Sequence, residues 1–122
     1  MQQLILMSAI LGALGVGIGA FGAHGLAARL EANGRGDTFR TATFYHLIHV
    51  LAILGAAWVS TQFESQFAVY AGYAFIAGIL LFSGSLYILA IFDIPIMGAI
   101  APLGGVAMII GWVLLGLAAI QG

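Results

Sequence analysis

Four long uncharged stretches, separated by a few charged residues, set the pattern of this sequence. They cover residues 1–28, 41–63, 65–92 and 94–122. A helix that crosses a bilayer needs about 20 mostly apolar residues, because each residue adds roughly 1.5 Å along the axis. Each stretch is long enough for one such helix and too short for two. The pattern therefore predicts an all-α fold in a single domain, residues 1–122: a four-helix transmembrane bundle with spans near 4–23, 42–60, 67–92 and 95–121.

The composition excludes an ordinary soluble domain. Hydrophobic residues make up 63% of the chain and charged residues 6%, whereas a soluble domain carries about 25% charged residues. A soluble fold of this size would expose apolar patches that drive aggregation. We expect the first stretch to be a membrane span that stays in the protein, not a signal peptide that is cleaved. A signal peptide begins with basic residues, and none precedes this stretch. The lack of cysteine excludes thiolate chemistry, and the lack of a basic run argues against nucleic acid as a partner.

Small residues form a continuous stripe along the first predicted span. Ser8, Gly12, Gly15, Gly19 and Gly22 follow one another at spacings of four and three, which places them on one helix face. In lipid, helices associate through close backbone packing, and small residues permit it. The stripe predicts that this helix packs through its glycines. We expect it to be central, with two neighbouring helices or a partner chain against it.

Several residues predict where the helices begin, end or bend. A short helical turn at the membrane surface is expected after the first span, ending at Gly34, with Asp37 as the N-cap of the second span. Asp93 is expected to cap the fourth helix, with Pro95 in its first turn. Pro102 lies about two turns into that helix and removes one backbone N–H. It therefore predicts a kink or an unwound point in the fourth span.

Polar residues within the spans gather at a similar depth. Most of them lie roughly 5–15 Å from the end of the bundle that carries the arginines. Polar groups are costly in hydrocarbon and usually face the bundle interior or a cavity. We expect one pocket or network that includes the backbone around Pro102, with His24 and His46 at its edge. Its predicted side chains are His24, Tyr45, His46, His49, Ser83, Ser85 and Tyr87.

The same residues offer little catalytic or metal chemistry. His46 and His49 lie three apart, a spacing that can bind a metal, but the spans contain no carboxylate to complete the site. Hydrogen-bonded interior histidines are the favoured interpretation, and two histidines on one helix do not suit haem. Ser83 and Ser85 are expected to bond neighbouring helices or their own backbone rather than act as nucleophiles. We therefore predict no catalytic residue, no metal and no cofactor.

The order of motifs resembles a known family. The motifs are residues 19–25 (GAFGAHG), 45–49 (YHLIH), 81–87 (LFSGSLY) and 102–105 (PLGG), followed by Gly111-Trp112. Together they resemble the small four-span domain-of-unknown-function family 423, whose mitochondrial relatives are called transmembrane protein 256. Members often carry glutamine at the position of His46, which weakens a metal role for that residue. The resemblance implies a bacterial plasma membrane or mitochondrial setting, and it implies no activity.

Two functions remain open on this basis, and a non-enzymatic role is favoured. The first is a helix-packing accessory subunit of a larger membrane complex, or a homo-oligomer, and its support is the glycine stripe. The second is an inner-leaflet site for a small amphipathic ligand, a quinone or a lipid, and its support is the polar layer beside Arg40. Transport is disfavoured, because four short helices offer no path through the apolar half of the bundle. Membrane lipid is a partner in every case.

The arginines predict the orientation in the membrane. All three lie between Arg29 and Arg40, and the chain contains no lysine. Loops rich in arginine and lysine stay in the cytoplasm. We therefore expect a multi-pass protein of the bacterial plasma (inner) membrane, with the Arg29–Arg40 loop cytoplasmic and both termini outside.

Reporter fusions at the two termini test this orientation. A reporter that is active only outside the cytoplasm should be active at both ends of the chain. A reporter that is active only in the cytoplasm should stay silent there. Activity of the cytoplasmic reporter at the C-terminus would contradict the assignment.

Overall fold

The computed structural model describes residues 1–121, and within them four helical segments are long and apolar enough to cross a membrane. The predicted all-α, four-span fold is confirmed. The spans are α1 (Gln2–His24), α3 (Gly36–Gln62), the continuous segment Gln66–Phe92, and α6 (Met97–Gln121). The third span is divided into α4 (Gln66–Gly78), one turn of π-helix η1 (Ile79–Ser83) and α5 (Gly84–Phe92), and a short helix α2 (Ala27–Asn33) precedes α3.

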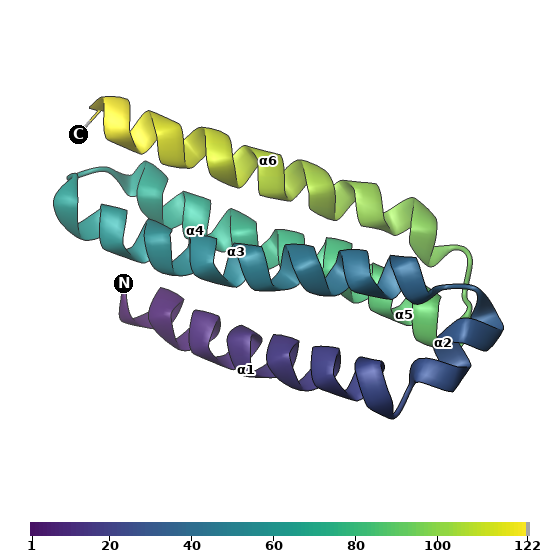
Figure 1. Ribbon diagram of the computed structural model, residues 1–122. Helices are drawn as coiled ribbons and strands as arrows, with labels where there is room; N and C mark the ends of the chain where they lie inside the picture. Colours follow the sequence, from purple (N-terminus) through teal and green to yellow (C-terminus); the bar gives the residue numbers. More distant parts are fainter. Residues whose placement is uncertain (122) are drawn as a thin grey trace.

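The spans lie side by side, with α3 and the α4–α5 segment in the middle and α1 and α6 at the two edges (Figure 1). The start of α1 and the end of α6 lie at the end of the bundle opposite α2. The expectation that the first span is central is wrong. In its most apolar 18-residue window, only 22% of α1 is buried, against 44% for α3 and 50% for the third span. One face of α1 packs against α3 and, through Leu4, against Gly72 of α4, and much of its remaining surface is exposed.

The connection between the first two spans folds as the amphipathic helix α2. It ends at Gly34, whose left-handed backbone (φ 66°) terminates the helix as the sequence indicates. Leu30 is the buried residue of α2, and it belongs to a hydrophobic cluster that also contains Phe39 and Tyr87. Apolar packing therefore fixes α2 across the end of the bundle.

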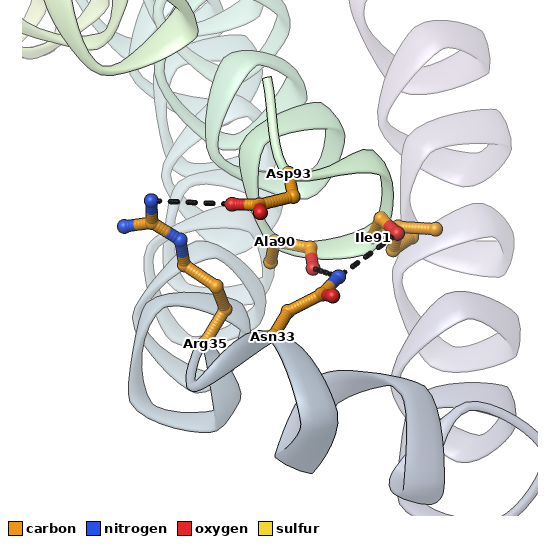
Figure 2. A network of polar contacts seen from close by, with 5 residues as sticks. All are labelled: Asn33, Arg35, Ala90, Ile91 and Asp93. Atoms are coloured by element: carbon orange, nitrogen blue, oxygen red, sulfur yellow. Dashed lines mark hydrogen bonds and ion pairs between the residues drawn. The ribbon is translucent and has the colours of Figure 1, made fainter. Parts of the chain in front are cut away.

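Polar contacts attach this connection to the end of α5 (Figure 2). The Asn33 side-chain amide donates to the carbonyl oxygens of Ala90 at 3.0 Å and Ile91 at 3.3 Å. The last carbonyls of a helix have no partner within the helix, so Asn33 satisfies two of them. Arg35 pairs with Asp93 at 3.4 Å. We call these contacts the Asn33 clasp.

Two helix ends differ from the prediction. Arg35, without a side-chain cap, is the N-cap of α3, and Asp37 lies in the first turn, where it pairs with Arg40. Asp93 ends α5 in the left-handed region (φ 53°), which its short polar side chain tolerates. Because α6 begins only at Met97, Asp93 is not its N-cap. Pro95 precedes α6. The helix continues through Pro102 without unwinding, and a bend of its axis stays a prediction.

Helix α6 contacts the third span backbone to backbone. A Cβ atom added to Gly104 would clash with the backbone nitrogen of Phe82 and lie 2.7 Å from the carbonyl carbon of Leu81. A Cβ added to Gly78 would lie 3.1 Å from the carbonyl oxygen of Gly104. The π-helical turn therefore sits directly on a side-chain-free point of α6. Only glycine permits this approach at position 104.

Alanine substitutions in α6 test this contact. Gly104→Ala should separate α6 from η1 and lower the thermal unfolding temperature in detergent, at a cost of about 1–3 kcal/mol for overpacking. Gly116→Ala is the matched control, because a Cβ there meets nothing within 4 Å. It should be neutral or stabilising by up to about 1 kcal/mol, through the higher helix propensity of alanine. Equal effects of the two substitutions would contradict the packing.

Candidate functional site

The two histidines of α3 are both buried but make contacts in different directions. His46 bonds to α1 and α5, whereas His49 bonds to α6 and packs its ring against Phe75 of α4. Their separation of three residues turns them about 60° apart around the helix, which is enough to reach different neighbours. The polar residues predicted to form one network therefore divide between two places.

His46 joins three helices in a closed network. Its Nε2–H donates to the carbonyl oxygen of Leu11 at 2.8 Å, since a carbonyl can only accept. In the neutral ring, Nδ1 then accepts from the Tyr87 hydroxyl, also at 2.8 Å. His46 is 3% exposed and Tyr87 9%. Both ring nitrogens are used, so the network is complete without a ligand.

The glycine stripe of α1 makes room for this network. A Cβ at Gly15 would lie 3.2 Å from His46 Nε2 and 2.6 Å from Leu47 Cδ2, so a side chain there would obstruct the path to the Leu11 carbonyl. The other stripe residues face α3 as well: Gly12 meets Val50, Gly19 meets Thr43, Gly22 meets Phe39, and the Ser8 hydroxyl donates to the Val50 carbonyl. The whole stripe is thus occupied within the monomer.

The two serines lie in the interior and His24 does not. Ser83, in η1, is fully buried and donates to the carbonyl oxygen of Ala42 in α3 at 2.8 Å. Ser85 is 5% exposed in α5. His24 is exposed at the end of α1. Ser83 therefore belongs to the packing of α3 against the third span, Ser85 is a buried residue of α5, and His24 stands apart from both.

His49 lies on the wall of an open groove. Its Nδ1–H donates to the Tyr45 carbonyl at 2.8 Å, and its Nε2 accepts from the Trp112 indole N–H at 3.0 Å. These residues, with Phe82 and Pro102, line a groove of about 440 Å³ between α3, η1 and α6, which we call the His49 groove. Tyr45 is 41% exposed and Trp112 47%, so the groove opens on the membrane-facing surface. It is lined by Tyr45, His49, Phe82, Pro102, Gly105, Val106, Met108, Ile109 and Trp112.

Sequence reasoning missed Trp112 and the π-helical turn. A usable signal for Trp112 existed: it lies in the middle of the fourth span, where its N–H needs a partner inside the protein. The π-helix has no comparable signal, although such turns often mark functional sites. Among residues 1–121, no three histidine, aspartate or glutamate side chains come together as a metal site.

The fold and its polar contacts define a small four-span integral membrane protein. The chain belongs to the family described as "Protein of unknown function (DUF423)", which matches residues 18–105. It is 43% identical to the UPF0382 membrane protein YwdK of Bacillus subtilis, over 99% of this chain and 98% of the relative. It is 39% identical to the UPF0382 inner membrane protein YgdD of Escherichia coli, over 97% of this chain and 89% of the relative. No solved structure matches the chain.

Substitutions of His46 test the closed network. His46→Leu leaves the Leu11 carbonyl and the Tyr87 hydroxyl without their partner and should lower the free energy of unfolding by about 1–2 kcal/mol. His46→Gln keeps one donor and one acceptor and should retain most of the stability. Thermal unfolding in detergent gives the comparison. If the glutamine variant is as unstable as the leucine variant, hydrogen bonding is not what His46 contributes.

Proposed function

We propose that this protein binds a small amphipathic molecule in the His49 groove, a ligand with a flat polar head such as a quinone. The observation that carries the proposal is an open groove of about 440 Å³ walled by the rings of Tyr45, Phe82 and Trp112, in which the His49–Trp112 hydrogen bond fixes the indole. Apolar pockets with a few convergent polar groups are the usual form of small-molecule sites.

Aromatic rings give the groove a preference for flat ligands. Tyr45 and Phe82 meet edge to face at 5.1 Å between ring centres, and Trp112 packs on Phe75 at 5.0 Å. These contacts hold the rings rigidly, so they form walls against which a planar head can stack. The Tyr45 hydroxyl supplies a donor for a carbonyl oxygen of the ligand. The apolar remainder, including Val106 and Ile109, suits a hydrocarbon tail.

We propose that the His49 groove binds its ligand without catalysing a reaction. No carboxylate or serine lines the groove, and the His49 lone pair already accepts from Trp112. We place the protein in a bacterial inner membrane, with the Arg29–Arg40 loop in the cytoplasm. That orientation puts the Pro102 end of the groove nearer the inner leaflet.

An accessory subunit is the second candidate, and one observation favours it. The stripe of Gly12 and Gly15 is occupied by α3, so it no longer supports a partner chain. A different set of small residues, Ala9, Ala13, Gly17 and Ala20, lies exposed along α1, and a Cβ at Gly17 meets nothing within 4 Å. Such a face permits close approach of another helix. A stoichiometric partner chain after purification in mild detergent would favour this candidate.

Fluorescence of the two tryptophans tests the quinone site. Trp58→Phe leaves Trp112 in the groove as the only tryptophan, whereas Trp112→Phe leaves Trp58, which is 62% exposed on α3 outside the groove. A short-chain benzoquinone should quench Trp112 with a saturable curve. It should quench Trp58 only in proportion to its concentration in the micelle.

A tyrosine substitution in the single-tryptophan protein supplies the affinity test. Tyr45→Phe removes the hydroxyl and keeps the ring, so the dissociation constant should rise about three- to tenfold for one lost hydrogen bond. Tyr70→Phe, on an exposed residue of α4 outside the groove, should leave it unchanged. Linear quenching of both tryptophans would contradict the proposal.

A further inference from the structure

A second groove lies at the α2 end of the bundle and shares no lining residue with the His49 groove. It has a volume of about 790 Å³ and is bounded by the end of α1, by α2 and by the first turns of α3. A bilayer around the four spans would place the charged residues near α2 at the headgroup level, because charged groups are costly in hydrocarbon. This groove would then run from headgroups into hydrocarbon, and we call it the interfacial groove.

Its lining changes from charged to apolar along its length. Glu31, Asp37 and Arg40 lie at the α2 end. Gly19 and Phe44 lie further along α1 and α3, at the seam where Gly19 packs against Thr43. A groove that is charged at one end and apolar at the other is complementary to a membrane lipid, which has a polar headgroup and apolar acyl chains.

The charges at the mouth select among headgroups. Among residues 1–121 the ion pairs are Arg35–Asp93 and Arg40–Asp37, so Glu31 is left outside both. Two carboxylates and one guanidinium give the lining a net negative charge, which disfavours a purely anionic headgroup. The side chains of Asp37 and Arg40 are 94% and 74% exposed, so both can bind a group from the bilayer.

We propose that the interfacial groove binds an ethanolamine phospholipid. The headgroup ammonium donates its N–H bonds to Glu31 and Asp37, the adjacent phosphate accepts from Arg40, and the start of one acyl chain lies along Gly19 and Phe44. Charge-assisted bonds of this kind require N–H donors. A choline headgroup carries the same charges but has no N–H, so it lacks the bonds to the carboxylates.

Native mass spectrometry of the full-length protein tests this site with three lipids of equal dioleoyl chains. The ethanolamine lipid should be retained about three- to fivefold more than the choline lipid, the range expected for exposed charge-assisted pairs. The glycerol lipid, which is purely anionic, should be retained less than the ethanolamine lipid. Equal retention of the ethanolamine and choline lipids, or preference for the glycerol lipid, would overturn the proposal.

Variants locate the effect. The pair Glu31→Gln and Asp37→Asn should abolish the preference for ethanolamine over choline, and Arg40→Gln should reduce retention of both lipids. Glu64→Gln, on an acidic residue at the opposite end of the bundle, is the matched control and should change neither. An unchanged preference in the double variant, or an equal loss in the control, would refute the site. Quinone quenching of Trp112 should be unaffected throughout, which separates this proposal from the function proposed above.

Discussion

The structure depends on one constraint of the bilayer: a polar group in hydrocarbon must find its partner inside the protein. Helix α3 meets this constraint for most of the bundle. Its His46 accepts from Tyr87 and donates to the Leu11 carbonyl, its Ala42 carbonyl accepts from Ser83, and its Val50 carbonyl accepts from Ser8. These bonds connect α3 with α1, η1 and α5. Helix α3 is therefore the element against which α1 and the third span are positioned, whereas α6 packs mainly on the third span.

These hydrogen bonds between helices also require the helix backbones to approach one another closely. The His46 hydrogen bond to α1 is possible because Gly15 has no side chain. The close contact of η1 with α6 is possible because Gly104 has none. Hydrophobic burial drives no association in lipid, so contact area and hydrogen bonds must supply the stability. This explains why Gly15 lies beside the His46 hydrogen bond to α1 and why Gly104 lies at the closest approach of α6 to the third span. It also explains why the edge helices α1 and α6 keep one packed face and one face for lipid.

The fold was predictable because uncharged length alone determines the number of spans. The glycine spacing also pointed to a packed helix face, which the structure places against α3. Depth along the helix predicted one network, but the structure divides its members: His46 bonds to Tyr87, whereas His49 bonds to Trp112. Rotation around the helix, which separates His46 from His49, depends on which neighbour each face meets, and the sequence of a single span does not contain that information. The π-helical turn and the role of Trp112 arise from contacts between spans in the same way.

The Asn33 clasp has a consequence for the order in which the protein assembles. Asn33 is separated from its acceptors Ala90 and Ile91 by 57 and 58 residues, almost half of the chain, and α3, α4 and η1 lie between them. Until α5 has been synthesised, the Asn33 amide lacks these two acceptors. The first connection can close only after α5 has been made and inserted. The contacts that hold α2 in place therefore form only after the third span has been added. A chain that ends before residue 90 lacks both acceptors of Asn33.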